Sequence, residues 1–287
     1  MMRFVLVLAL AAANAGAQES TLSISPASPA PGSLVTLTLS EPSQNTDAIY
    51  GEMAGEQLHF HRAANGSWRA IGPVPVDARG KVSAWAVVGS MPDTVRAFIT
   101  IPEPKPSTGK GKPRALAVSP RFTRPLSAET EARIERENAT AREIGRKAHE
   151  TKRMWTLPFI RPRASVITSR FGSGRMFNGT LSARHLGVDF RGSTGESVRA
   201  ANRGVVALVD NFFLAGNVVY IDHGDGVVTA YFHLSKTLVQ KGDTVSRGEE
   251  IGRVGSTGRV TGPHLHWSAR YGAVTINPLD LTTVTAR

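Results

Sequence analysis

The chain has 287 residues and carries 34 Lys or Arg against 23 Asp or Glu, a net charge of +11, with no Cys. This length suits two modest domains with linkers rather than one small core. The absence of cysteine excludes disulfides and restricts any metal ligands to nitrogen and oxygen atoms.

Residues 1–17 predict a secretory leader. Met1-Met2-Arg3 supplies the charge, Phe4 to Ala13 the apolar core, and Ala15-Gly16-Ala17 the small residues of a cleavage site. We expect the mature chain to begin near Gln18. A membrane anchor is the alternative, but the apolar run is shorter than the roughly 20 residues of a membrane-spanning helix. Export argues against nucleic acid as the partner of this basic chain. An anionic polymer outside the cytoplasm fits better, and a basic surface that serves only solubility is the alternative.

Residues 18–102 predict a small antiparallel β-sandwich of immunoglobulin-like type. Short alternating apolar runs, such as Leu34 to Leu39 and Val82 to Val88, are separated by Pro, Gly and Asn. This segment contains His59-Phe60-His61, an HxH pattern on a predicted strand. Because no HxxxD partner lies nearby, we interpret the pattern as an exposed strand face rather than a metal site.

Residues 103–154 predict a linker followed by a connector helix. Pro104 to Pro113 is rich in Pro, Gly, Ser and Lys, a composition that resists packing. Ser127 can cap a helix that has acidic residues in its first turn and basic residues from Arg146 to Arg153 toward its end, charges that suit the helix dipole. Few of its positions are apolar, so we expect a largely exposed connector.

Residues 155–287 predict a second, mainly antiparallel β domain. Asn217 to Asp222 and Val227 to Phe232 are β-branched, apolar runs joined by His223-Gly224-Asp225-Gly226, which indicates a hairpin. We interpret His223, in the turn, as structural. Short runs punctuated by glycine continue to Pro263 and indicate further strands.

Three patterns in the second domain could carry chemistry: His185-Leu186-Gly187-Val188-Asp189, then His233, then His264-Leu265-His266. Side chains alternate along a strand, so His264 and His266 share one face. A catalytic zinc site uses three protein ligands and leaves a position for water. His185, Asp189 and one imidazole of the later pair supply that set, and spacing leaves open which one.

Residues 155–281 resemble the lysostaphin-type metallopeptidases of family M23, also called LytM domains. The order, spacing and number of the matching stretches make the resemblance specific. These stretches are Arg170-Phe171-Gly172, Asn178-Gly179, His185 to Phe190, Ile221 to Gly224, Tyr231 to Ser235, Gly252 to Gly258 and Thr261 to Trp267.

The resemblance implies a zinc metalloendopeptidase with a C-terminal antiparallel β domain of LytM type. It implies one Zn²⁺ per chain, held by His185, Asp189 and His266, with His233 and His264 flanking the attacking water. The two flanking imidazoles would orient or deprotonate the water, or hydrogen-bond the oxyanion, and those roles stay undivided. We therefore expect a periplasmic or secreted, DD-endopeptidase-like enzyme that hydrolyses peptide cross-links of bacterial peptidoglycan, with the peptide stems as its partner.

Two alternatives stay open. Some LytM-like proteins have lost zinc ligands and activate cell-wall amidases without catalysis, but this chain has every polar residue that the resemblance requires. A secreted bacteriolytic peptidase acting on glycine-rich peptides would carry the same motifs, because a motif reports reaction class rather than substrate. The N-terminal domain resembles no family and could bind the wall, cover the groove, or dock a regulatory or adaptor protein.

Overall fold

The structure is a computed structural model that describes residues 20–40, 49–88, 94–101, 114–123, 125–179 and 181–284. The predicted leader and the Pro-rich linker lie outside these ranges. Within the described ranges, one α-helix accompanies many strands. No helix there is both long and apolar enough to cross a membrane.

The N-terminal part is a sandwich of two four-stranded sheets, ordered β1-β2-β6-β5 and β4-β3-β7-β8. In β2, Leu37 and Leu39 are buried whereas Thr36 is exposed, so the alternation in sequence becomes an inner and an outer face. The inner faces of both sheets form one apolar core, which confirms the predicted sandwich. Its immunoglobulin-like type stays a prediction. The strands are β1 (Thr21–Ser25), β2 (Leu34–Ser40), β3 (Ile49–Met53), β4 (Glu56–Gln57), β5 (His61–Arg62), β6 (Trp68–Pro73), β7 (Gly80–Val88) and β8 (Thr94–Ile101).

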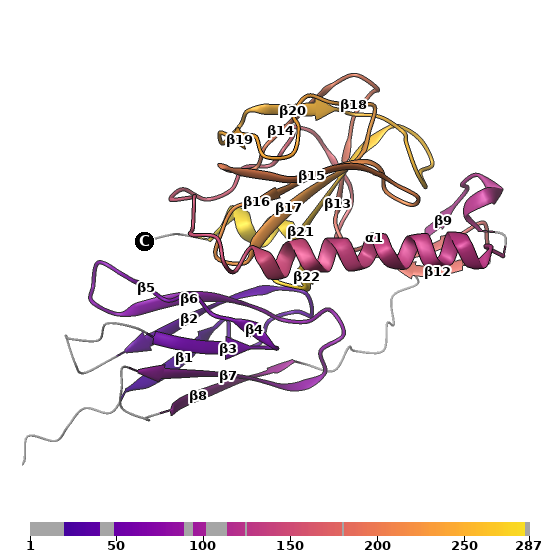
Figure 1. Ribbon diagram of the computed structural model, residues 1–287. Helices are drawn as coiled ribbons and strands as arrows, with labels where there is room; N and C mark the ends of the chain where they lie inside the picture. Colours follow the sequence, from indigo (N-terminus) through magenta and orange to yellow (C-terminus); the bar gives the residue numbers. More distant parts are fainter. Residues whose placement is uncertain are drawn as a thin grey trace, which may run out of the picture.

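The connector helix α1 (Ala128–Lys147) begins where its cap predicts. Ser127 Oγ accepts a hydrogen bond from the Thr130 N–H at 3.2 Å. The helix ends at Lys147, so the last basic residues of the predicted run lie beyond it. Figure 1 shows α1 lying along the C-terminal part. At Gly145 an added Cβ would lie 1.8 Å from the Gly272 carbonyl oxygen, so one side of the helix packs tightly. Only Ala141 and Gly145 are buried in α1, in agreement with the expected largely exposed connector.

The C-terminal part is built on an eight-stranded sheet, ordered β10-β13-β21-β17-β16-β15-β19 with β22 paired to β21. Its pairs are antiparallel, and the predicted hairpin is formed by β16 and β17. Two small sheets flank it, ordered β12-β11-β9 and β14-β20-β18. The elements are β9 (Arg114–Leu116), η1 (Pro120–Phe122), β10 (Ile167–Ser169), β11 (Gly174–Phe177), β12 (Leu181–Arg184), β13 (Val188–Arg191), β14 (Ser197–Arg199), β15 (Gly204–Phe212), β16 (Gly216–Asp222), β17 (Val227–Leu234), β18 (Lys236–Thr237), β19 (Thr244–Val245), β20 (Glu250–Arg253), β21 (His264–Tyr271), β22 (Val274–Ile276) and η2 (Pro278–Thr282).

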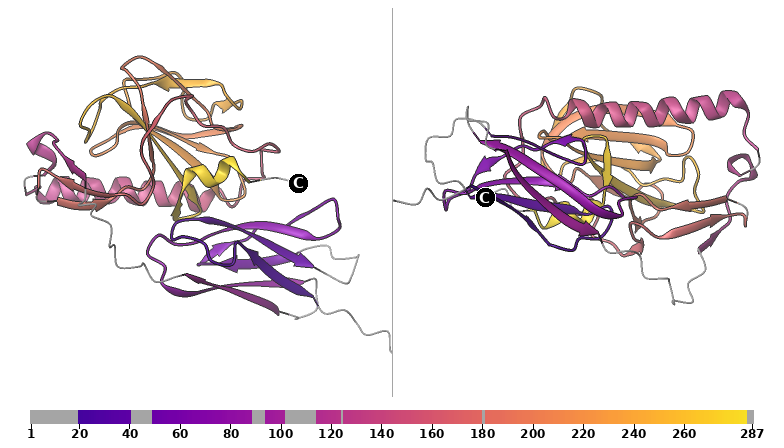
Figure 2. Two further views of the ribbon diagram at one scale, coloured as in Figure 1. Left: turned by 180° about the vertical axis from the view of Figure 1, so that it is seen from behind. Right: turned by 90° about the horizontal axis from the view of Figure 1, so that it is seen from below.

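The sandwich contacts the C-terminal part at the end of β21 and at η2. The Tyr271 hydroxyl donates to the Gln57 carbonyl at 2.8 Å, and the Asp280 carboxylate accepts from the Leu34 N–H at 2.9 Å. Figures 1 and 2 show the sandwich beside β22. Since β21 begins at His264, the sandwich lies at the opposite end of this strand from the HxH pattern.

Candidate metal centre

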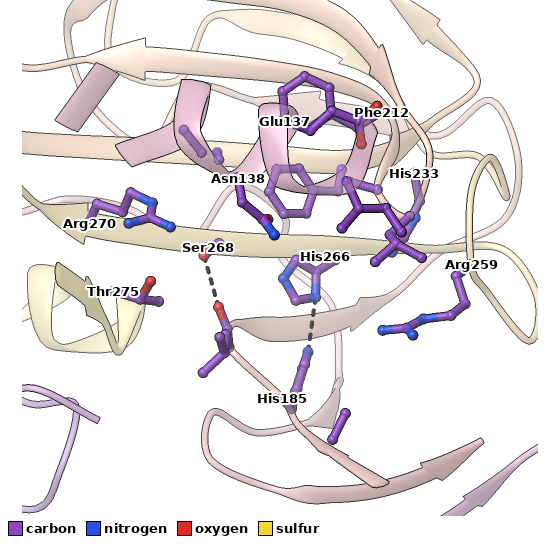
Figure 3. A pocket seen from close by; sticks show the side chains of 18 of the residues that line it. Glu137, Asn138, His185, Phe212, His233, Arg259, His266, Ser268, Arg270 and Thr275 are labelled. Carbon is purple, nitrogen blue, oxygen red and sulfur yellow. Dashed lines mark hydrogen bonds between the residues drawn. The ribbon is translucent and has the colours of Figure 1, made fainter. Parts of the chain in front are cut away.

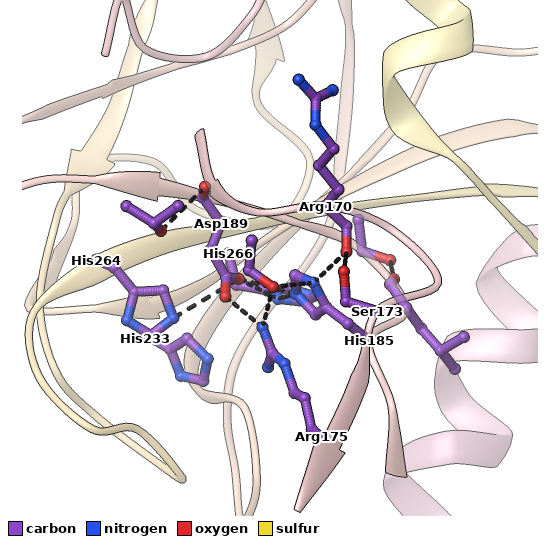
Figure 4. A network of polar contacts seen from close by, with 12 residues as sticks. Arg170, Ser173, Arg175, His185, Asp189, His233, His264 and His266 are labelled. Atoms are coloured by element: carbon purple, nitrogen blue, oxygen red, sulfur yellow. Dashed lines mark hydrogen bonds and ion pairs between the residues drawn. The ribbon is translucent and has the colours of Figure 1, made fainter. Parts of the chain in front are cut away.

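The pairing of β13 with β21 brings the predicted ligands together. Asp189 lies directly opposite His266 in this antiparallel pair, so both side chains occupy one face. His185 precedes β13 and approaches from the same side. Its Nε2 lies 2.9 Å from Asp189 Oδ1 and 2.9 Å from His266 Nδ1 (Figure 4). His266 Nδ1 lies 2.9 Å from the same Asp189 oxygen.

These three donor atoms form a buried set that suits a metal ion. His185, Asp189 and His266 are 2%, 6% and 8% exposed, and their ligand atoms all lie within 4.8 Å of one another. Two imidazole nitrogens and one carboxylate oxygen match the donor set of three-ligand catalytic zinc sites. Three polar atoms turned toward a single point inside the protein are costly unless a cation or protons satisfy them, so the site fits a divalent ion.

The surroundings fix which nitrogen of His185 faces the centre. Its Nδ1 lies 3.0 Å from the Arg170 carbonyl oxygen and 3.1 Å from Ser169 Oγ. A carbonyl oxygen only accepts hydrogen bonds, so Nδ1 carries the proton and Nε2 offers its lone pair to the centre. On the other side, Gly187 leaves room for His266, because an added Cβ would lie 2.4 Å from His266 Nε2.

The charge of Asp189 is held in place by its neighbours. Burial alone would raise the pKa of this carboxyl, but in the metal-free protein the neighbouring His185 and His266 imidazoles bring the pKa far below its usual range. Arg175, on β11, also forms an ion pair with Asp189 and donates to Ser169 Oγ at 3.3 Å. The sequence motifs do not single out Arg175. No local pattern marks its role, because the fold of β11 over β13 creates the contact.

The other two predicted residues, His233 and His264, lie beside this set. Their ring centroids are 5.0 Å apart, and His264 Nε2 lies 3.7 Å from Asp189 Oδ1. His233 Nδ1 donates to the Thr257 carbonyl at 2.8 Å, and His264 Nδ1 donates to the Gly262 carbonyl at 2.9 Å. In the neutral form of each ring, Nε2 is therefore the unprotonated nitrogen.

His233 is held in an unusual state. Its backbone φ is +64°, in the left-handed region that non-glycine residues rarely occupy, and such strain is concentrated at functional sites. Burial lowers the pKa of His233 well below its ordinary value, and the neighbouring His264 and His266 lower it further. The imidazole is therefore neutral at neutral pH. The structure thus brings the five predicted residues together, while their roles stay predictions.

Two cavities flank the centre. The inner one, about 270 Å³, lies between α1 and the sheet, and His185, His233 and His266 reach into it (Figure 3). The outer one, about 220 Å³, is bordered by Asp189 and His264. Helix α1 contributes Glu137 and Asn138 to the inner wall. The predicted connector is therefore one side of the groove, which its polar sequence did not reveal.

The HxH pattern of the sandwich is not an exposed strand face, and that interpretation was wrong. His59 Nε2 lies 2.9 Å from His149 Nδ1, and His61 Nε2 lies 2.5 Å from Asp225 Oδ2. His149 Nε2 in turn donates to a Glu56 carboxylate oxygen at 3.0 Å. These residues join the sandwich to the C-terminal part, and only the C-terminal centre brings three ligand atoms together among the residues described.

Comparison with known proteins covers the same region. The description "Peptidase family M23" matches residues 183–278, a range that contains the five predicted site residues. "Peptidoglycan DD-endopeptidase ShyA" of Vibrio cholerae is 49% identical over 102 residues, which is 35% of this chain and 24% of that protein. "DD-carboxypeptidase/endopeptidase Mpg" of Neisseria meningitidis is 44% identical over 101 residues, 35% of this chain and 23% of that protein. The chain thus spans about a quarter of the length of these relatives.

A solved structure extends the similarity of fold to both parts of the chain. A candidate M23 peptidase from Pseudomonas aeruginosa superposes with a TM-score of 0.65 over 90% of this chain and 96% of that one. The sequence identity is 24%, so this likeness concerns the fold alone. It supports the predicted combination of an N-terminal β part with a C-terminal antiparallel β part.

Proposed function

The chain belongs to peptidase family M23 through its residues 183–278, and from this premise we propose that it is a zinc metalloendopeptidase that hydrolyses peptide cross-links of peptidoglycan. The observation that carries the proposal is the convergence of His185 Nε2, Asp189 Oδ1 and His266 Nδ1 between two cavities. A peptide crossing both cavities would present one amide bond to this point.

His185, Asp189 and His266 would hold one Zn²⁺, as the resemblance implies. Zinc in such a site lowers the pKa of a bound water from about 15.7 toward about 7 and polarises the scissile carbonyl. Asp189 would bind the ion as a carboxylate, because the pKa of this group lies far below its usual range. Arg175 and Ser169 fix the directions of Asp189 and His185.

His233 and His264 would transfer protons as general base and general acid. In its neutral form each ring offers Nε2 as the acceptor, since its Nδ1 donates to a backbone carbonyl. A neutral imidazole at this place can accept a proton from the attacking water and then pass it to the leaving amine. The same N–H, once formed, can hydrogen-bond the oxyanion of the tetrahedral intermediate. Either residue could fill either role.

Peptidoglycan peptides are proposed as substrate because relatives named as DD-endopeptidases share this domain at 49% and 44% identity. A wall substrate would require a location outside the cytoplasm, in agreement with the predicted leader at residues 1–17. We also propose that the N-terminal sandwich, residues 18–102, is a separate domain that docks on the catalytic one through residues 103–154.

Digestion of purified peptidoglycan by the mature chain tests the proposal. The zinc-loaded protein is expected to convert cross-linked muropeptide dimers to monomers, as measured by mass spectrometry, and a chelator is expected to stop this. Cleavage of pentaglycine with intact dimers would favour a bacteriolytic peptidase. No cleavage of either substrate by protein with a full zinc complement would favour the non-enzymatic activator.

A further inference from the structure

The residues that line the inner cavity include more basic than acidic side chains. Its lining includes four arginines, Arg175, Arg184, Arg259 and Arg270, against one acid, Glu137. Three of these arginines have acceptors in the described chain. Arg175 pairs with Asp189, Arg184 bonds to the Val76 carbonyl, and Arg270 bonds to the Ala273 carbonyl.

Arg259 differs from the other three. Its guanidinium lies 4.1 Å from the centroid of the Phe177 ring, and no hydrogen bond or ion pair satisfies it among the residues that the structure describes. The side chain is only partly exposed, and it borders both the inner and the outer cavity. Figure 3 shows it directed into the cavity beside His266. It thus lies where the two cavities meet, next to the candidate metal centre.

An unpaired guanidinium in a partly buried groove is costly unless a ligand completes it. Stacking on an aromatic ring fixes the plane of the guanidinium, and its forked N–H groups then match a carboxylate in a bidentate manner. Glu137 cannot serve this purpose, since it pairs with Arg133 and accepts from the Phe213 N–H. The described residues therefore leave the guanidinium of Arg259 open to a ligand in the cavity.

We propose that Arg259 binds a free α-carboxylate on the residue that supplies the leaving amine. This inference rests on the proposed function. On the acyl side of the scissile bond, the α-carbonyl carbon is itself part of the amide. An α-carboxylate adjacent to the bond can therefore belong only to the amine side. Arg259 thereby selects cross-links with a free carboxylate there over glycyl bridges that continue as amides, and over substrates amidated at that position.

The test uses two synthetic cross-linked peptides that differ only in a carboxylate or a carboxamide on the amine-side residue. Zinc-loaded wild-type protein is expected to prefer the carboxylate. Because loss of one partner of a desolvated ion pair is costly, Arg259→Gln is expected to lower kcat/KM for the carboxylate on the order of a hundredfold. For the carboxamide the expected change is about threefold or less. Arg259→Lys keeps the charge but loses the forked N–H groups, so its kcat/KM for the carboxylate peptide should lie between those of the wild type and Arg259→Gln.

Arg184→Gln is the matched control, because it removes the same charge from the same cavity but from a side chain already bonded to Val76. It should leave the substrate preference unchanged. Equal losses on both substrates in Arg259→Gln, or no preference in the wild type, would overturn the inference while the proposed function stands. Binding of both peptides by calorimetry to zinc-loaded His233→Ala, with and without Arg259→Gln, provides a readout independent of turnover. A carboxylate preference in binding that needs Arg259, without cleavage by the wild type, would refute the proposed function and with it the leaving-amine part of the inference, and would leave Arg259 as a carboxylate-binding residue.

Discussion

The chain contains two HxH patterns that serve different purposes. One is His59-Phe60-His61 in the sandwich, and the other is His264-Leu265-His266 in the C-terminal sheet. Both face a carboxylate. His61 Nε2 lies 2.5 Å from Asp225, and His266 Nδ1 lies 2.9 Å from Asp189. Only the second belongs to a set of ligand atoms that converge on one point, within the part of the chain that the structure describes.

The two patterns differ in the third imidazole that lies beside the HxH pair and the carboxylate. At the sandwich, His59 Nε2 donates to His149 Nδ1 and His149 Nε2 donates to Glu56, so the imidazoles form a chain of hydrogen bonds. In the C-terminal sheet, His185 is turned by the Arg170 carbonyl so that its lone pair faces Asp189 and His266. The local pattern is the same, and the tertiary neighbours decide between a domain contact and a metal centre.

The largest effect is expected from the carboxylates of the two sites. Asp189→Ala should abolish zinc binding and lower kcat/KM by at least about a thousandfold, because the activated water is lost. Asp225→Ala should keep both zinc and activity, at a cost of roughly 1–3 kcal/mol in the free energy of unfolding. Metal analysis and urea titration measure the two outcomes. Equal zinc loss in both variants would contradict the claim that Asp189 binds the metal and Asp225 does not.

A somewhat smaller effect is expected at His233. His233→Ala should keep its zinc but lose about 10²–10⁴ in kcat, because only proton transfer is removed. A His233→Ala protein without zinc would instead place this residue among the ligands. Inductively coupled plasma mass spectrometry of the purified variant, alongside its kinetics, separates the two cases.

Gly187→Ala probes the packing around the centre without removing a donor atom. The added Cβ would lie 2.4 Å from His266 Nε2, so the imidazole must shift. Zinc affinity should fall by about 10–100-fold, as for other changes in the support of metal ligands. Competition with a chelator of known affinity measures this. Gly262→Ala, which has open space at its Cβ, is the control and should keep the wild-type affinity.

The features that the sequence predicted are those that depend on residues close together in the chain. The β parts, the cap of α1 and the hairpin around His223 depend on neighbours in sequence, and each was predicted. The proximity of His185, Asp189 and His266 followed from family resemblance, since no local rule pairs β13 with β21. The ion pair of Arg175 with Asp189, the packing of α1 and the hydrogen bond of His59 to His149 depend on contacts between distant segments, which no periodicity reports.

The smallest effect concerns His223, a buried imidazole outside both sites. Burial lowers its pKa from 6.5 to about 4, and its ring bonds to the Arg203 carbonyl and to Thr229. Between these two pH values the unfolded chain binds the proton and the folded chain does not. The free energy of unfolding therefore falls as the pH falls from 6.5 to 4, by at most about 3 kcal/mol from this group.

His223→Gln removes this titration. Metal-free wild-type protein should lose more stability than metal-free His223→Gln between pH 7 and pH 4.5, as measured by urea unfolding. Metal-free samples are required because zinc release would add its own pH dependence. Parallel stability profiles for the two proteins would show that His223 binds its proton equally well in the folded and unfolded chains.

The most direct measurement compares zinc per chain in two matched double variants. His59→Ala with His61→Ala should keep one full equivalent of zinc, because these imidazoles serve the contact between the two parts. His264→Ala with His266→Ala should bind none with comparable affinity, because the pair includes a proposed ligand and its neighbour. Zinc lost from the first variant, or retained by the second, would contradict the assignment of the metal centre to His185, Asp189 and His266.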